Sequence, residues 1–281
     1  MEKLKLFASG DSFTDASFTS REYGTTISKA WPEVLAERLG DNWEAFNAGC
    51  AGHGNDYIVS SLFRYIALNG KPDCVAICWT SSGRLTLTGN NRCKESRPGV
   101  LGRIHIDPVG WLRSIEYKPW KQLSHDDHMI KAFTDFSEYF TRKHFPHNYY
   151  GFAVENFLTN VFTVQDYCTS NNIPYVFISG INICGSYDEL AERSGGRSAR
   201  FSKCVPSMFI NSNMFNAIDD ETFIGWPLFS QFGGFIFHDI IKHKNHRREK
   251  YCMGEKDGHP NDAGHALMAD MMYKRLKEVK L

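Results

Sequence analysis

The sequence lacks an excess of charge of either sign. Its 281 residues include 32 lysines and arginines and 32 aspartates and glutamates, so the formal net charge at pH 7 is zero. A neutral chain has no broad electrostatic field with which to hold nucleic acid or an anionic membrane. We therefore predict neither nucleic acid nor a membrane as a partner. The basic segment 242–248 is best interpreted as a solvated face, although it could contact an anionic substrate or partner.

Long hydrophobic runs and a disulfide framework are also lacking. No apolar segment approaches the length needed to span a bilayer, and the N-terminus has the character of a charged strand rather than of a signal peptide. The eight cysteines form no Cys-x-x-Cys pair, and several lie in apolar runs, as Cys78 does in the segment 75–79. Cysteines of this kind are typical of reduced, buried thiols. We therefore predict a cytoplasmic protein.

Spacings typical of metal ligands are absent as well. His238, His243 and His246 lie close together, but their spacing matches no standard zinc finger and no cysteine pair accompanies them. We predict that the protein uses no metal and no other cofactor.

What the sequence does contain is an alternation of short apolar segments with segments of helical periodicity. Continuous apolar runs such as 73–79 are typical of strands buried on both faces. Strands that alternate with helices favour a parallel sheet, so we predict an α/β fold, a three-layer α/β/α sandwich. The expected strands are 3–8, 43–46, 73–79 and 175–179, and the expected helices are 29–39, 55–68, 150–168 and 262–277.

Two long segments do not follow this alternation. The segment 89–147 is rich in tryptophan, arginine, histidine and proline, and the segment 185–256 contains a Gly/Ser/Arg-rich stretch followed by many aromatic residues. We predict a single domain over residues 1–281 in which both segments are insertions over the active edge of the sheet, where they could form a lid. A second compact domain is the alternative, although no linker is evident.

Small polar residues follow the expected strands where parallel sheets bind their ligands, beyond the carboxyl ends of the strands. Ser12 belongs to a Gly-Asp-Ser tripeptide after the first strand, and that tripeptide alone is a common turn. Near the other end of the chain, Asp257 and His259 lie in a loop just before the last helix. Such a loop can present an imidazole to a serine across the sheet edge, with the carboxylate orienting the ring. Ser12 is therefore a candidate nucleophile.

Three segments carry a family resemblance. The segments 10–15 (GDSFTD), 47–52 (NAGCAG) and 257–261 (DGHPN) resemble the first, second and last sequence blocks of the SGNH (GDSL) hydrolase superfamily, and they occur in the family's order. The resemblance implies a flavodoxin-like parallel sheet and the cleavage of acyl esters, often acetyl or acyl groups on sugars and lipids, without a metal.

The resemblance also implies roles for individual residues. Ser12 would be the nucleophile, His259 the general base and Asp257 the partner of that base. The N–H groups of Ser12 and Gly52 would stabilise the oxyanion. Asn47, which opens the second block, is counted with the residues around the oxyanion and the substrate.

The sequence departs from the family pattern in two places. The third block normally supplies an asparagine as an oxyanion donor, but Ser81 stands at that position, and Arg84 could reach in instead. An arginine there would suit a substrate with a carboxylate or phosphate. The family also places the acid three residues before the histidine, whereas Asp257 lies two before it and Glu255 four before it. Both carboxylates therefore stay open as the acid.

These observations lead to one main hypothesis and two alternatives. The main hypothesis is an SGNH-type serine esterase, a carboxylic ester hydrolase that cleaves an acyl ester, such as an acetyl ester, on a carbohydrate or other small molecule through an acyl-enzyme. The lid-like insertions favour an acyltransferase with the same site, because excluding water favours transfer. The missing third-block asparagine favours a catalytically weak binding protein on the same scaffold.

Overall fold

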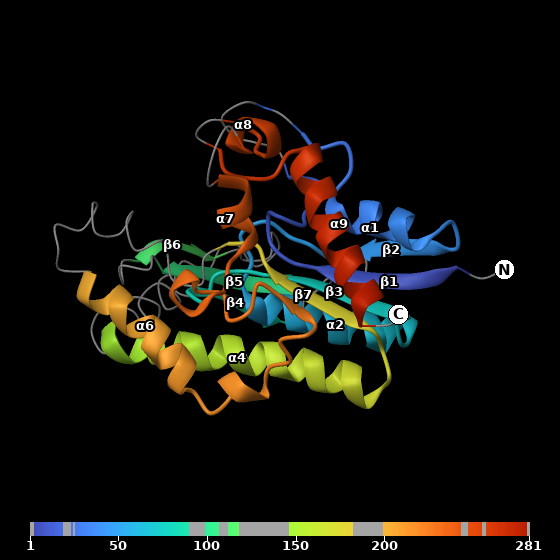
Figure 1. Ribbon diagram of the computed structural model, residues 1–281. Coiled ribbons are helices and arrows are strands. Elements are labelled where there is room, and N and C mark those ends of the chain that lie inside the picture. Colours follow the sequence, from blue (N-terminus) through green and yellow to red (C-terminus); the bar gives the residue numbers. More distant parts are fainter. Residues whose placement is uncertain are drawn as a thin grey trace, which may run out of the picture.

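A five-stranded parallel sheet forms the centre of the computed structural model (Figure 1). Its strand order is β2-β1-β3-β7-β8, which is the 2-1-3-4-5 order of flavodoxin-like sheets. The predicted parallel α/β fold is therefore confirmed. The strands are β1 (Leu4–Ser9), β2 (Trp43–Asn47), β3 (Cys74–Trp79), β7 (Tyr175–Ser179) and β8 (Phe223–Ile224). The structure describes residues 3–18, 24, 26–89, 99–106, 112–117, 146–181, 199–242, 247–254 and 257–279.

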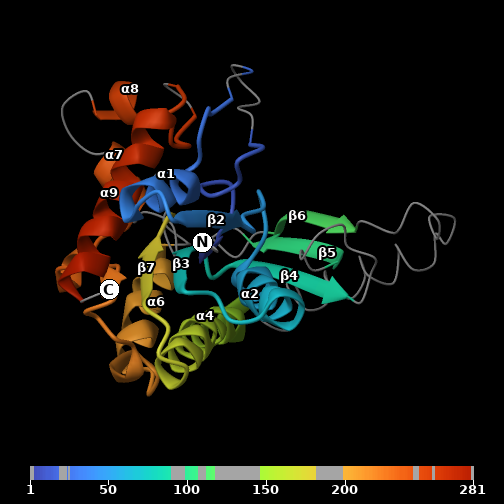
Figure 2. The same cartoon turned by 90° about the vertical axis from the view of Figure 1, so that its right-hand side faces the viewer.

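Helices cover both faces of this sheet and make the fold a three-layer sandwich (Figures 1 and 2). One face carries α1 (Trp31–Leu39), α7 (Phe237–Lys242) and α9 (Asp262–Glu278). The other face carries α2 (Asn55–Asn69), α4 (Pro146–Ser170) and α6 (Ala199–Asn211). The remaining short elements are η2 (Phe215–Ala217), η3 (Ser230–Phe232) and α8 (Arg247–Tyr251). Among the described residues, no helix combines the length and apolar character that crossing a membrane requires.

The strand β3 shows why the chain folds into three layers. All six of its residues are buried, because successive side chains point to opposite faces of the sheet and both faces are covered by helices. Val75, Ile77 and Trp79 pack in the core beneath α2 and α4. Cys74 and Cys78, with Ala76, pack in the core beneath α1 and α9. Burial raises the pKa of the Cys78 thiol well above its usual range, so the thiol stays protonated.

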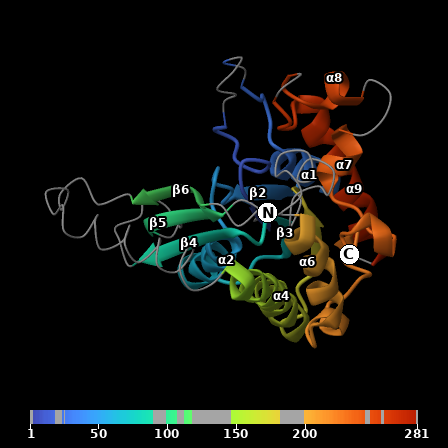
Figure 3. The ribbon, with the colours of Figure 1, turned by 90° about the vertical axis from the view of Figure 1, so that its left-hand side faces the viewer.

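The first predicted insertion contains most of a separate small sheet. In it, β4 (Arg84–Gly89), β5 (Gly99–Ile106) and β6 (Leu112–Tyr117) pair antiparallel in sequence order. This sheet extends beside α2, away from the five-stranded sheet, as the opposite views in Figures 2 and 3 show. The small sheet begins at Arg84, which lies only five residues after the end of β3. Arg84 therefore lies close to the carboxyl edge of the main sheet and is also the first residue of the small sheet.

Part of the second predicted insertion belongs to the main sheet and its covering layers. The range 185–256 contributes β8 to the five-stranded sheet, and it contributes Phe209 and Phe237 to the two cores. A strand of two residues inside an aromatic-rich segment carries no period that a sequence pattern can reveal. The division into one domain with two insertions, and the role of either segment as a lid, stay predictions.

Candidate active site

Ser12 lies in a tight turn directly after the strand β1, which lies between β2 and β3 in the sheet. The turn begins at Gly10, where a Cβ atom would lie 2.2 Å from Thr14 Oγ1 and 2.8 Å from the carbonyl oxygen of Cys78. Only glycine allows the backbone to approach both groups. Ser12 is 6% exposed, so the turn holds this residue at the boundary of the protein interior.

The structure brings Ser12, His259 and Asp257 together across 247 sequence positions. Ser12 Oγ lies 2.9 Å from His259 Nε2, and His259 Nδ1 lies 2.6 Å from Asp257 Oδ1. When the Nδ1–H group donates a hydrogen bond to the Asp257 carboxylate, the lone pair of Nε2 faces the serine hydroxyl and can accept its proton. The three side chains therefore have the geometry of a nucleophile, a base and an orienting acid.

Asp257 reaches His259 despite the short spacing of two residues. Its Oδ1 also accepts the backbone N–H of His259 at 3.1 Å, so one oxygen holds both the backbone and the ring of the same residue. This local turn explains how a carboxylate at this spacing contacts the imidazole. The other candidate acid, Glu255, lies outside the described residues, as do His243 and His246 of the histidine cluster.

Two phenylalanine rings flank the His259 ring. The ring centroid of Phe18 lies 4.1 Å from that of His259, with an interplanar angle of 31°. Phe13 lies 5.4 Å away at 48°. These contacts restrict the orientation of the imidazole in addition to the Asp257 hydrogen bond. Phe18 precedes the first helix by many residues, and no sequence pattern predicted a role for it.

Two backbone N–H groups near Ser12 lack a partner in the part of the chain that the structure describes. The N–H groups of Phe13, Thr14 and Asp15 all donate to Asp11, whereas Ser12 N donates to no group among the described residues. The same holds for Gly52 N within the described ranges; Gly52 is exposed and has a φ of 76°, a value that favours glycine. Unpaired donors of this kind are what an oxyanion requires.

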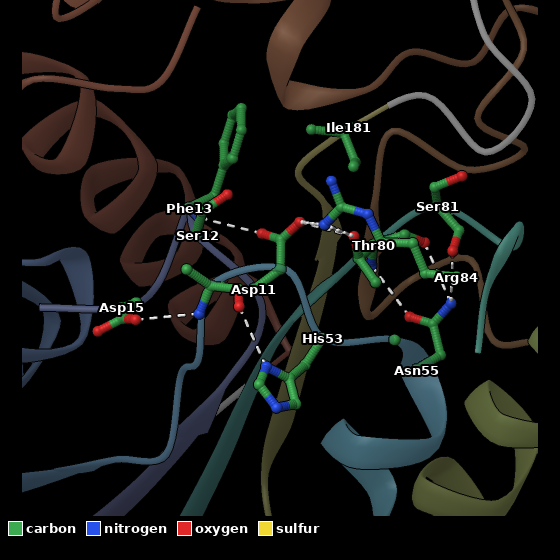
Figure 4. Close-up of polar contacts among 12 residues, drawn as sticks. Asp11, Ser12, Phe13, Asp15, His53, Asn55, Thr80, Ser81, Arg84 and Ile181 are labelled. Atoms are coloured by element: carbon green, nitrogen blue, oxygen red, sulfur yellow. Dashed lines mark hydrogen bonds and ion pairs between the residues drawn. The ribbon is translucent and has the colours of Figure 1, made fainter. Parts of the chain in front are cut away.

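Asp15 ties the Gly52 turn to the Ser12 turn. Its Oδ2 accepts the backbone N–H of Ala51 at 2.9 Å (Figure 4), and the N–H of Cys50 donates to the carbonyl of Gly10 at 3.0 Å. The structure shows that its carboxylate joins two segments that follow different strands.

The side-chain amide of Asn47 makes its hydrogen bonds to groups of the protein itself. Its Nδ2 donates to the carbonyl of Thr14 at 2.9 Å and to Glu33 Oε1 at 3.2 Å, and its Oδ1 accepts the N–H of Gly49 at 2.9 Å. The Asn47 amide therefore links the turn that contains Ser12 to the turn that contains Gly49. A contact between Asn47 and a substrate stays a prediction.

The segment 80–83 follows β3 at the carboxyl edge of the sheet, and Asn55 holds it in place. The sequence motifs do not single out Asn55. Asn55 is buried, its Oδ1 accepts the N–H of Thr80 at 3.0 Å, and its Nδ2 donates to the carbonyl of Thr80 at 3.1 Å. Ser81 Oγ accepts the N–H of Gly83 at 3.3 Å. The position of Asn55, directly after a Gly54 that caps α2, is the signal that could have marked it.

The partner of Arg84 is a protein carboxylate, and a role of Arg84 as an oxyanion donor stays a prediction. Its Nη1 lies 2.5 Å from Oδ2 of Asp11, whose side chain has no exposed surface (Figure 4). The charge of Arg84 is thus balanced inside the protein, and an anionic substrate does not follow from its presence. Asp11 and Arg84 are 73 positions apart in the sequence, so no local pattern could have paired them.

His265, one turn into α9, contrasts with His259. It is 1% exposed, and its Nδ1 accepts the backbone N–H of Trp31 at 3.2 Å. Burial lowers the pKa of His265 to about 4, with a further lowering by His259 and an opposing effect from Asp262. His265 is therefore a neutral hydrogen-bond acceptor between α9 and α1.

Comparisons with known proteins find only distant likenesses to solved structures. No protein-family model and no curated protein matches the chain. Among solved structures, the acetylxylan esterase Axe2 from Geobacillus stearothermophilus is 15% identical with a TM-score of 0.41, over 98% of this chain and 94% of that one. A carbohydrate acetylesterase family member from Sinorhizobium meliloti is 8% identical with a TM-score of 0.43, over 98% of both chains. The acetyl xylan esterase AlAXEase is 14% identical with a TM-score of 0.40, over 99% of this chain and 100% of that one.

The activity of these proteins does not transfer to this chain, because each TM-score is below 0.5 and each identity is below 25%. Membership of the SGNH superfamily therefore rests on the three sequence blocks and stays a proposal. The fold and the geometry around Ser12 stand on the structure itself.

Proposed function

We propose that this protein is a serine hydrolase of SGNH type that cleaves carboxylic esters. The observation that carries the proposal is the chain of contacts from Ser12 Oγ through the imidazole of His259 to the carboxylate of Asp257, at 2.9 and 2.6 Å. The hydroxyl, the base and the acid therefore lie within hydrogen-bonding distance of one another.

The reaction begins with transfer of the Ser12 proton to His259 Nε2 as Ser12 Oγ forms a bond to the acyl carbon. The carbonyl oxygen becomes an oxyanion, for which the N–H groups of Ser12 and Gly52 are the candidate donors. The protonated His259 then gives its proton to the leaving alcohol as the ester C–O bond breaks, which leaves an acyl-enzyme. Water then attacks the acyl carbon as His259 Nε2 takes its proton. The bond between that carbon and Ser12 Oγ breaks, His259 returns the proton to Ser12 Oγ, and the free acid leaves.

The proposed substrate is an acyl ester, such as an acetyl ester, on a carbohydrate or other small molecule. This part rests on the resemblance of the segments 10–15, 47–52 and 257–261 to the superfamily blocks. The balanced charge of the Arg84–Asp11 pair fits a neutral ester at least as well as an anionic one.

A fluorophosphonate probe tests the nucleophile without knowledge of the substrate. We expect the probe to label Ser12, and Ser12→Ala to lose both labelling and the hydrolysis of p-nitrophenyl acetate. The matched control is Ser207→Ala, because Ser207 is an exposed serine on α6. Full hydrolysis by Ser12→Ala would contradict the proposal, and an intact but unlabelled protein would favour a binding function.

Product analysis separates hydrolysis from acyl transfer. Incubation with an acetyl ester in the presence of a free sugar should release acetate and leave the sugar unmodified. Acetylated sugar as the main product would assign the same Ser12–His259 chemistry to an acyltransferase.

A further inference from the structure

The Asp11 carboxylate is a buried negative charge next to the proposed nucleophile. Its Oδ2 accepts hydrogen bonds from Arg84 Nη1 at 2.5 Å and from Thr80 Oγ1 at 2.6 Å, and its Oδ1 accepts the N–H of Phe13 at 3.0 Å (Figure 4). A buried charge is strongly disfavoured unless it is paired and hydrogen-bonded. The carboxylate is therefore held in one position by its own turn and by the segment 80–84.

Asp11 in turn organises the backbone on which Ser12 sits. Its side chain accepts the N–H of Phe13, and its carbonyl accepts the N–H groups of Thr14 at 2.9 Å and Asp15 at 3.0 Å. One residue thus takes up the three N–H groups that follow Ser12. The Ser12 N–H is left for the oxyanion, and the direction of Ser12 Oγ depends on the same turn.

The groups that hold Asp11 are themselves anchored. Thr80 Oγ1 also accepts from Arg84 Nη1 at 2.9 Å, and both backbone groups of Thr80 are bound by the Asn55 amide. Arg84 is the first residue of β4, and its side chain is 15% exposed. These hydrogen bonds therefore connect the start of α2 and the start of β4 to the turn that follows β1.

We propose that Arg84 is a positioning residue of the active site: through Asp11 it holds the Ser12 turn in its reactive geometry. The inference rests on the proposed function. It assigns a role to the segment in which the superfamily's oxyanion asparagine is replaced by Ser81. Arg84 acts there on the protein's own carboxylate, with Nη1 shared between Asp11 and Thr80.

The test compares Arg84→Met, Asp11→Asn and the double variant Asp11→Asn/Arg84→Met in the full chain. With p-nitrophenyl acetate, we expect Arg84→Met to lower kcat by about 10–100-fold with little change in KM, because a misplaced nucleophile slows the chemical step more than binding. The rate of fluorophosphonate labelling of Ser12 should fall in parallel.

The double variant should recover most of the lost kcat. In Asp11→Asn the new amide can still accept the Phe13 N–H through its oxygen, and its own N–H can donate to Thr80 Oγ1. The neutral methionine side chain in Arg84→Met then leaves no unpaired charge. If Arg84→Met does not fold, the double variant still decides the question. The control is Lys5→Met, an exposed ion-pair residue at the other end of β1, which should leave kcat and KM unchanged.

Two results would overturn the inference. A folded double variant that stays as slow as Arg84→Met would mean that the Arg84 guanidinium acts on the substrate directly. A large rise in KM with an unchanged kcat would make it a substrate-binding group. Failure of the unchanged protein to label at Ser12 is a different result, because it contradicts the proposed function and the inference together.

Discussion

The two ends of β1 each carry an ion pair, and the two pairs differ in burial. At the amino end, Lys5 pairs with Glu44 on the neighbouring strand β2, and the side chains are 38% and 46% exposed. Beyond the carboxyl end, Asp11 pairs with Arg84, and the side chains are 0% and 15% exposed. The Lys5–Glu44 ion pair is therefore solvated, whereas the Asp11–Arg84 ion pair lies in the protein interior.

The difference in burial decides what each pair does. An exposed pair adds little to stability, because water and salt screen the charges and each partner stays solvated alone. A buried pair adds little net stability either, but removal of one partner leaves an unsolvated charge, which is strongly destabilising. The sheet thus places its sensitive ion pair at the edge where Ser12, Asp257 and His259 meet.

The largest expected effect comes from breaking the buried pair on one side. Arg84→Met should lower the free energy of unfolding by about 3–5 kcal/mol, because the Asp11 carboxylate remains buried without its counter-charge. Urea denaturation followed by far-UV circular dichroism measures this loss. Asp11→Asn/Arg84→Met should regain most of it, and a loss by Arg84→Met as small as that of an exposed-pair variant would contradict the comparison.

The next effect concerns His265, a second buried ionisable group on this side of the molecule. Its pKa is lowered to about 4 by burial, against 6.5 for a free histidine, so the unfolded state binds a proton in this pH window and the folded state does not. Its contribution is present above pH 6.5 and is lost as the pH falls toward 4, on the order of 3 kcal/mol in total.

Stability measured against pH tests this sign. His265→Asn removes the titration, so the difference in unfolding free energy between the unchanged protein and the variant should shrink as the pH falls from 6.5 to about 4. Parallel stability curves over this range would show that the burial of His265 has no such consequence.

A smaller loss of unfolding free energy is expected when the uncharged side chain of Asn261 is replaced. Asn261 caps α9, where its Oδ1 accepts the N–H of Gly264 at 3.0 Å, and its Nδ2 donates to the carbonyls of Lys250 and Cys252. Asn261→Ala should cost about 1–2 kcal/mol of unfolding free energy, because the cap is lost but no charge is stranded. Asn261→Asp keeps the cap acceptor but removes both Nδ2 donors, so a loss as large as that of Asn261→Ala would assign the effect to those donors.

The smallest effect is expected at the exposed pair. Glu44→Gln and Lys5→Met should leave the urea midpoint unchanged within error, since each remaining charge stays in water. The pKa of Glu44 is lowered by its hydrogen bond to Lys5, so a carboxyl titration of the Lys5→Met variant should show that pKa rising toward its ordinary value. A loss of stability comparable to that of Arg84→Met would remove the distinction between the two ends.

The local periodicity of the sequence predicted most of the central fold. The strands 43–46 and 73–79 and the helices 55–68 and 262–277 all occur, with ends that differ by a few residues at most. These elements are long or apolar enough for their burial pattern to show in the sequence. The two-residue strand β8 and the antiparallel sheet β4-β5-β6 were not predicted, because both lie in segments whose pairing partners are set by the fold around them.

Most of the central strands and helices, and the choice of Ser12 and His259 as candidates, followed from the sequence, because turn residues and apolar periods are local properties. The tertiary structure was needed to show that Asp257 contacts the imidazole, that Arg84 pairs with Asp11, and that the Asn47 amide binds backbone groups. The physical reason is that a hydrogen bond or an ion pair depends on a few ångströms of distance, and that distance is fixed by packing between segments far apart in the chain.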